Sequence, residues 1–323
     1  KVDNDFDKNG VRELYTQLMS MSRKLQYQKL VEAGALGRLP FIQIDSLEKD
    51  TARVVFQGTE GAYGEAAMHQ FFGEDVNCFH VRTFRDAMEE VASGKADYAV
   101  LPIENSTEGI VTDIYDLLTE YQLYIVGEQG MKVEHVLLGI PGSSLEEIKT
   151  VYSHPQALAQ CKKYLESHPD WKAVKTENTA GAAKKIHEEL DRTQAAIASR
   201  AAGELYGLSV MAENICYNEE NVTRFIIVSA HPVYEKSAAK ISVSFELPHE
   251  SGTLYHMLSH FIYNGLSMTK IESRPITGKK WEYRFFVDFE GNLEDPAVKN
   301  ALRGLEAEAN RMRVLGNYGQ QEE

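Results

Sequence analysis

The sequence predicts an α/β protein built from an N-terminal amphipathic helix, a two-lobed α/β domain and a small βαββαβ module. The lobes follow from residues 53–229, where short β-branched runs alternate with helical stretches as in βαβ units. The module follows from residues 240–315, where the predicted elements change to the βαββαβ order of a ferredoxin-like fold. We expect the three parts at residues 1–48, 49–231 and 238–317 of the 323.

The composition excludes several classes of protein. Lys and Arg number 34 and Asp and Glu 48, so the formal net charge is −14. This acidic excess argues against nucleic-acid binding, which needs a basic face, and against docking on an anionic membrane. No apolar run approaches the ~20 residues of a membrane span, and the N-terminal residues lack a signal-peptide core. We therefore expect a cytoplasmic protein.

The cysteines and histidines predict no metal site. Cys78, Cys161 and Cys216 are far apart and odd in number, which indicates buried thiols in a reducing compartment rather than a disulfide framework. His256 and His260 have the i, i+4 spacing of metal ligands, but no Glu follows His256 and no third ligand is evident. We expect two polar or half-buried histidines on a helix.

The N-terminal helix has one apolar stripe. Val11, Leu14, Leu18, Met21 and Leu25 alternate in steps of three and four, so they share one face of a helix. Because one helix cannot bury its own stripe, we expect it to dock on the rest of the chain or on a second copy.

The two lobes are expected to consist of mostly parallel sheets with a cleft between them. The long extended stretch Tyr124–Ile140 would carry the chain from one lobe to the other. The strands are predicted at Arg53–Gln57, Val76–His80, Tyr98–Pro102, Tyr124–Glu128, Lys132–Ile140, Thr150–Ser153, Ala173–Thr176, Ala195–Ala198, Ser209–Ile215 and Arg224–Ser229. Helices are predicted at Phe84–Ala92, Gln156–Glu166 and Gly181–Leu190.

The C-terminal module has its own element order. Its strands are predicted at Ile241–Glu246, Met268–Ser273, Tyr283–Phe289 and Met312–Leu315, with a turn at Thr277-Gly278. Its helices are predicted at Ser251–Tyr263 and Pro296–Ala309. The tail from Gly316 is expected to be frayed.

Small polar residues recur where a predicted strand leads into a helix. These junctions are Glu104-Asn105-Ser106-Thr107, Ser153-His154-Pro155-Gln156, Asn178-Thr179 and Ser199. Each side chain can simply cap its own helix. In open α/β sheets, however, such junctions gather at the carboxyl ends of strands, where helix N-termini suit an anion. Four junctions in one region make an anion-binding cleft an equal alternative.

Two further motifs contain residue types that can carry chemistry. Gly58-Thr59-Glu60-Gly61-Ala62-Tyr63-Gly64 follows the first strand, but its GxxGxxG spacing lacks the GxGxxG fingerprint and no acidic residue follows the second strand. This spacing argues against a dinucleotide-dependent dehydrogenase, and it leaves open that the glycine-rich turn brings the backbone close to another ligand. Thr223 and Arg224 begin an apolar strand and can offer a proton donor beside a carboxylate clamp, or can be an ordinary strand start.

Together these segments resemble prephenate dehydratase with a C-terminal ACT regulatory domain, a two-lobed plan like that of periplasmic binding proteins. The resemblance rests on Pro102-Ile103-Glu104-Asn105-Ser106 with Gly109, Ser153-His154-Pro155-Gln156-Ala157-Leu158, Ala196-Ile197-Ala198-Ser199, Asn221-Val222-Thr223-Arg224-Phe225 and Ile271-Glu272-Ser273-Arg274-Pro275. The N-terminal helix, with Met21-Ser22-Arg23-Lys24-Leu25-Gln26, resembles the last helix of the chorismate mutase domain of bifunctional relatives.

The resemblance implies conversion of prephenate to phenylpyruvate, water and carbon dioxide, without a cofactor or metal. Thr223 matches the essential threonine and would bond the departing hydroxyl group. The implied substrate-binding residues are Asn105, Ser106, Gln156, Ser199, Asn221, Arg224 and Phe225. A non-catalytic two-lobed small-molecule binding or sensor protein is the alternative.

The resemblance also implies regulation by phenylalanine. The effector would bind between ACT modules of neighbouring subunits in a homodimer or homotetramer. The implied residues are Gly252, Thr253, Leu254, Glu272, Ser273, Arg274 and Pro275.

Overall fold

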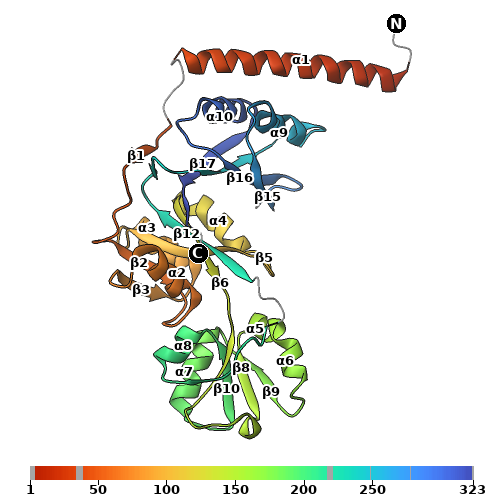
Figure 1. Cartoon of the computed structure of the whole chain (residues 1–323). Helices are drawn as coiled ribbons and strands as arrows, with labels where there is room; N and C mark the ends of the chain where they lie inside the picture. The colour runs from red at the N-terminus through yellow and green to blue at the C-terminus, as the bar shows by residue number, and fades with distance from the viewer. Residues whose placement is uncertain (1–3, 34–38, 217–220, 248, 277, 322–323) are drawn as a thin grey trace. The chain divides into compact units, whose positions relative to one another are not determined.

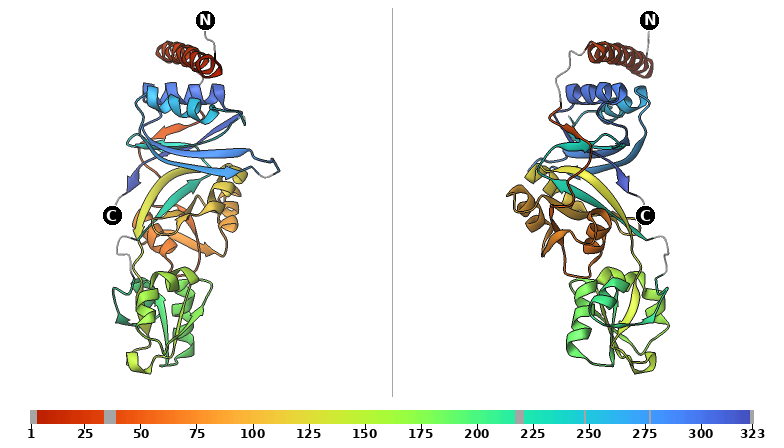
Figure 2. Two further views of the ribbon diagram at one scale, coloured as in Figure 1. Left: turned by 90° about the vertical axis from the view of Figure 1, so that its right-hand side faces the viewer. Right: turned by 60° about the vertical axis from the view of Figure 1, so that its left-hand side comes forward.

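The computed structural model describes residues 4–33, 39–216, 221–247, 249–276 and 278–321. The chain forms two compact units, one of residues 1–46 with 232–319 and the other of residues 47–231 with 320–323. Figures 1 and 2 show the elements of both units. The division into three parts at residues 48 and 238 stays a prediction.

The second unit contains the two predicted lobes. Lobe A is built on a sheet of order β6-β12-β4-β2-β3. Its strands are β2 (Arg53–Gln57), β3 (Asn77–Val81), β4 (Tyr98–Asn105), β6 (Tyr124–Lys132) and β12 (Val222–Ser229). Its helices are α2 (Tyr63–Phe72), α3 (Phe84–Ala92) and α4 (Thr112–Tyr121). The chain end returns here, because β18 (Gln320–Gln321) pairs with β6.

Lobe B has a sheet of order β11-β7-β10-β8-β9, drawn in green in Figure 1. Its strands are β7 (Val136–Gly139), β8 (Thr150–Ser153), β9 (Lys172–Lys175), β10 (Gln194–Ala198) and β11 (Ser209–Ala212). Its helices are η1 (Leu145–Glu147), α5 (Pro155–Gln160), α6 (Lys162–Glu166), α7 (Thr179–Glu189) and α8 (Arg200–Leu205). Alternate side chains of the strands enter separate cores on the two faces, one under α7 and one under α5 and α6. The predicted single helix Gln156–Glu166 is wrong in one detail, because it breaks at Cys161.

Two segments connect the lobes. The first runs from β6 to β7 and the second from β11 to β12. The predicted two-lobed fold is therefore confirmed, including the crossing near Tyr124–Ile140. The expectation of mostly parallel sheets is wrong at the strands flanking the crossings. There β12 is antiparallel to both of its neighbours in lobe A, and β7 is antiparallel to both of its neighbours in lobe B.

The first unit contains the predicted βαββαβ module. Its elements are β14 (Lys240–Glu246), α9 (Thr253–Tyr263), β15 (Met268–Pro275), β16 (Tyr283–Glu290), α10 (Pro296–Glu308) and β17 (Arg311–Tyr318). The antiparallel sheet has the order β15-β16-β14-β17, and α9 and α10 cover one face of it (Figure 2). Thr277 of the predicted turn lies outside the described residues. A short parallel pair, β1 (Ile42–Ile44) with β13 (Val233–Glu235), belongs to the same unit.

The expectation of a frayed tail from Gly316 is wrong. β17 continues to Tyr318, and Asn317 and Tyr318 are buried. The Asn317 amide donates to the carbonyls of Lys240 and Gly291, and its oxygen accepts from Leu293 N–H. A polar side chain that joins three backbone segments holds the end of this strand in the core.

Helix α1 (Asp5–Glu32) docks within the first unit through a polar face, not through its apolar stripe. Lys24 is buried, donates to Ser259 Oγ at 2.5 Å and lies 4.3 Å from the ring centre of Tyr263. Leu14 and Leu18 of the stripe are 65% and 60% exposed. The expectation that the stripe docks on the rest of the chain is wrong for the described residues, and docking on a second copy stays a prediction.

Over the described part of the chain, no helix combines the length and hydropathy needed to cross a bilayer.

Candidate active site

A buried polar cluster lies where the second crossing enters lobe A. Thr223 on β12 is paired in register with Asn105 at the end of β4, so their side chains are neighbours. The Asn105 amide donates one N–H to Thr223 Oγ1 and one to Asn221 Oδ1, each at 2.8 Å. All three residues are buried. Asn105 thus uses both of its amide hydrogens to fix the two β12 residues.

The same cluster joins lobe A to lobe B through Gln160. Asn221 Nδ2 donates to Gln160 Oε1 at 3.2 Å, and Gln160 is the last residue of α5. Thr107 Oγ1 also donates to Asn221 Oδ1, at 3.2 Å. Gln160 is not among the site residues predicted from the sequence. A signal was present in the sequence, because Gln160 lies one helical turn after Gln156 and therefore on the same face of the helix. A second polar side chain on that face indicates a second candidate for the site.

Asn105 organises a turn rather than a helix N-terminus. Its Oδ1 accepts from the N–H groups of Thr107 and Glu108, both at 3.0 Å, and the short strand β5 (Gly109–Ile110) intervenes before α4. Ser106 is tied to β12, since its Oγ accepts from Val222 N–H at 3.0 Å. The junction predicted as a helix cap is therefore a hydrogen-bonded turn, because β5 interrupts the chain before the helix.

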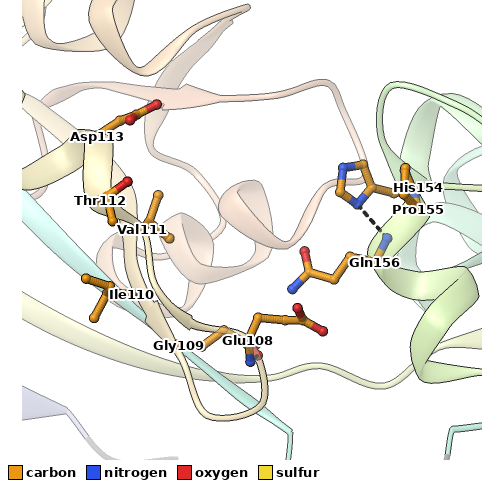
Figure 3. A pocket seen from close by; sticks show the side chains of 10 residues that line it. Glu108, Gly109, Ile110, Val111, Thr112, Asp113, His154, Pro155 and Gln156 are labelled. Atoms are coloured by element: carbon orange, nitrogen blue, oxygen red, sulfur yellow. Dashed lines mark hydrogen bonds between the residues drawn. The ribbon is translucent and has the colours of Figure 1, made fainter.

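A cavity with a volume of about 580 Å³ adjoins this cluster. Figure 3 shows the side chains of Gln156 and Glu108 pointing toward one another across it. Glu108 and Asp113 bring two carboxylates to its lining, and no Arg or Lys lines it among the residues that the structure describes. The full lining is Asn105, Glu108, Gly109, Ile110, Val111, Thr112, Asp113, His154, Pro155 and Gln156.

The two histidines near the cavity are neutral at physiological pH. Burial lowers the pKa of His154, and its Nδ1 accepts from Gln156 N–H at 3.3 Å as a neutral ring can. Burial lowers the pKa of His135 to about 4, although a hydrogen bond with Gln160 opposes this shift. The Tyr63 hydroxyl lies 3.1 Å from His135 Nδ1. Neither ring supplies a cation for an anionic ligand.

The other two predicted junctions meet the glycine-rich turn instead of the cavity. Ser199 caps α8 by accepting from Ala202 N–H, and it donates to Gly61 O at 3.1 Å. Asn178 caps α7 and accepts from the Thr59 hydroxyl at 3.4 Å. The four junctions therefore form two groups, with Asn105 and Gln156 at the cavity and Asn178 and Ser199 at the Gly58–Gly64 turn.

Arg224 and Phe225, like Thr223 itself, are not among the described residues that line the cavity. Arg224 forms ion pairs with Glu128 at 2.9 Å and Glu104 at 3.3 Å. Phe225 is 3% exposed, and its ring packs beside Gly64 in lobe A. Strand alternation puts Thr223 on the opposite face of β12 from Arg224. Both residues support the strand that carries Thr223.

The predicted regulatory residues lie in the C-terminal module. Gly252 has φ 86° at the N-cap of α9, Thr253 opens that helix, and Leu254 packs against the module core. Glu272, Ser273, Arg274 and Pro275 lie on β15, the edge strand of the sheet order given above. His260 of the same helix is buried rather than half-buried and lies 3.2 Å from Glu308.

The architecture and the cluster define a class of protein. Two α/β lobes joined by two crossings, with a polar site at one crossing, place the chain among the two-lobed α/β proteins. The model of the family "Prephenate dehydratase" matches residues 54–233. The chain belongs to the prephenate dehydratase family and is a lyase of phenylalanine biosynthesis.

Three similar proteins illustrate the relationship. The bifunctional chorismate mutase/prephenate dehydratase of Escherichia coli (strain K12) is 36% identical over 299 residues, which cover 90% of this chain and 78% of that protein. The structure of prephenate dehydratase from Arthrobacter aurescens in complex with L-Phe has a TM-score of 0.77 and 35% identity, covering 83% of this chain and 89% of that one. The structure of GqqA, described as a novel type of quorum quenching acylase, has a TM-score of 0.77 and 34% identity, with 83% and 98% covered.

Proposed function

We propose that the cluster around Thr223 and the adjoining cavity carry out the decarboxylating dehydration of prephenate to phenylpyruvate. The observation that supports this most is the double hydrogen bond from Asn105 to Thr223 and Asn221 beside the cavity. Aromatisation of the ring supplies the driving force. The protein therefore has to hold two carboxylates, orient the ring and help the hydroxyl group to leave.

Thr223 is the group that bonds the departing hydroxyl. Its Oγ1 accepts from Asn105, so its own hydrogen is directed elsewhere and is available to substrate. A threonine hydroxyl is a very weak acid. We therefore assign it polarisation of the leaving group or relay of a proton, and a positioned donor of this kind contributes about 10²–10³ in rate.

The cavity lining carries both polar and apolar side chains for the two substrate carboxylates. Thr112 and Gln156 provide a hydroxyl and an amide donor, whereas both amide hydrogens of Asn105 are already used within the cluster. Ile110, Val111 and Pro155 provide an apolar part. The ring carboxylate belongs at the apolar part, because a weakly hydrated carboxylate loses carbon dioxide more easily.

The remaining predicted substrate-binding residues act as supports in this proposal. Ser106 and Asn221 hold the turn and β12, Ser199 bonds to Gly61, and Arg224 is paired with two carboxylates. Each is engaged by protein groups, so we assign it to positioning of the cluster rather than to direct contact with prephenate. Phe225 lies in the core of lobe A and has the same role.

We also infer that the C-terminal module binds phenylalanine and regulates the reaction. The related Arthrobacter aurescens structure holds L-Phe, and β15 is an edge strand with Ile271 48% exposed. An edge strand invites a neighbouring subunit, so an effector near Gly252 and Arg274 would be enclosed in a homodimer or homotetramer. Coupling to the cavity then needs two states with different effector affinity. A rate of prephenate turnover that does not change under saturating phenylalanine would contradict the proposed regulation.

The reaction is tested by incubating the purified chain with prephenate and following phenylpyruvate. We expect turnover without added cofactor. Binding of prephenate without product would instead support a non-catalytic sensor. In the same assay, titration with phenylalanine should change the rate of turnover. The oligomeric state of the chain, measured separately, should change as well. We also propose that the protein is located in the cytoplasm.

A further inference from the structure

Two thiols meet beside the polar cluster. Cys161 Sγ and Cys216 Sγ are 3.4 Å apart, although 55 residues separate them in the sequence. Cys161 is buried at the break between α5 and α6, and Cys216 is half-buried on the second crossing. Both pack with Ile215 and Ile197 in a core of lobe B. The sequence predicts only buried thiols that are far apart, because the contact between them depends on how the crossing folds.

The pair is chemically unequal. The hydrogen bond between the thiols lowers the pKa of Cys216 to about 7 and raises that of Cys161. A thiol with a pKa near the ambient pH is the best attacking group in thiol–disulfide exchange. Cys216 is also the more exposed of the two residues. Cys78, on β3, takes no part in this contact and serves as an internal control.

We propose that Cys161 and Cys216 form an oxidisable dithiol, a covalent modification site for small-molecule disulfides. The Cys216 thiolate attacks one sulfur of the reagent, the S–S bond of the reagent breaks, and one thiol leaves. Cys161 then loses its proton and attacks Cys216 Sγ, which forms the protein disulfide and releases the second thiol. The protein dithiol is oxidised by two electrons and the reagent is reduced to two thiols.

The disulfide would act on the polar cluster through Cys161. Cys161 directly follows Gln160, and the Gln160 side chain bonds to Asn221. A disulfide needs the sulfurs at about 2.05 Å instead of 3.4 Å, so we expect Cys161 and the end of α5 beside it to shift by up to roughly 1 Å. A misplacement of that size in a catalytic site lowers the rate up to about 100-fold. This consequence rests on the proposed function.

The modification is tested on the full chain with excess oxidised glutathione. We expect intact mass to fall by two hydrogens, a peptide map to contain the Cys161–Cys216 cross-link, and dithiothreitol to reverse both. Cys78→Ser should form the same cross-link, whereas Cys216→Ser should not. Only glutathione adducts, or a cross-link that uses Cys78, would overturn the proposal. Thermal unfolding of each reduced variant shows that it is folded before the reagent is added.

The effect on the site is measured separately by prephenate turnover before and after oxidation. We expect kcat to fall roughly ten- to 100-fold on cross-linking and to recover with dithiothreitol. A cross-linked protein with unchanged kcat would overturn the coupling to the site. A reduced protein that forms the cross-link but never turns over prephenate would instead contradict the proposed function and leave the modification site standing.

Discussion

The amide nitrogen of Asn105 lies 2.8 Å from the hydroxyl oxygen of Thr223, across the β4–β12 pair. The same amide group holds Asn221 at the same distance. Because Asn221 also bonds to Gln160 on α5, one asparagine connects the threonine of lobe A to a helix of lobe B. The geometry of the site therefore depends on how the two lobes meet at the second crossing.

The ion pair beneath this site should be important for stability. Glu128 is 1% exposed and bonds to Arg224 at 2.9 Å. Arg224→Met removes this partner from a buried carboxylate, so we expect the free energy of unfolding to fall by about 3–5 kcal/mol. Denaturant unfolding measures this loss.

Two variants control that measurement. Arg200→Met breaks an ion pair of similar length with Glu213, in which both side chains are more than half exposed, and should cost less than about 1 kcal/mol. Adding Glu128→Gln to Arg224→Met should restore part of the stability, because the buried charge is gone. Equal losses for Arg224→Met and Arg200→Met would show that burial of Glu128 is unimportant.

Much of this architecture follows from sequence pattern. The strand–helix alternation and the βαββαβ order could be predicted because hydrophobic periodicity and turn residues are local signals. The way in which α1 docks could not be predicted, because Lys24 buries its long aliphatic side chain against α9 while the apolar stripe of α1 stays exposed. Local sequence does not reveal which face of a helix meets a partner.

The lowered pKa of His135 predicts that the folded protein loses stability in mild acid. The pKa of His135 is about 4 in the folded protein, below the ordinary value of 6.5, because the ring is buried. Above pH 6.5 the ring is neutral in both the folded and the unfolded chain, so its contribution to the free energy of unfolding is fully present. It is lost as pH falls toward 4, because the unfolded chain binds the proton first. We expect roughly 2 kcal/mol to be lost by pH 5.

The variant His135→Gln isolates this effect. Unfolding free energies of both proteins between pH 7.5 and 5 are compared, and the variant should lose less stability across that range. His154 shifts in the same direction and is present in both proteins, so it cancels in the difference. Parallel curves would show that His135 does not titrate as assigned.

Glu108 should oppose the binding of an anionic substrate. Its carboxylate lines the cavity, where no Arg or Lys among the described residues offsets it. Glu108→Gln removes a negative charge, so we expect KM for prephenate to fall about three- to tenfold, with a smaller effect at high salt. Steady-state kinetics at two ionic strengths provide the test. Asp170→Asn, exposed on a lobe B loop, should leave KM unchanged; a similar fall there would make the effect one of net charge.

The candidate site itself could be predicted only in part. Thr223, Asn105 and Asn221 belong to motifs that the resemblance identifies, and the structure joins them in one cluster. Gln160 and the Cys161–Cys216 contact arise from segments far apart in sequence, which only the fold brings together. Ser199 and Arg224 have the residue types expected of anion binders, but the fold engages both with protein partners.

The central claim is that the Thr223 hydroxyl assists the departure of the substrate hydroxyl group. The most direct measurement compares kcat for prephenate in Thr223→Val, which keeps the shape without the hydroxyl, and in Thr223→Ser, which keeps the hydroxyl. We expect kcat to fall about 10²–10³-fold for Thr223→Val and to remain within about tenfold of the parent for Thr223→Ser. A folded Thr223→Val protein with near-normal kcat would contradict the claim.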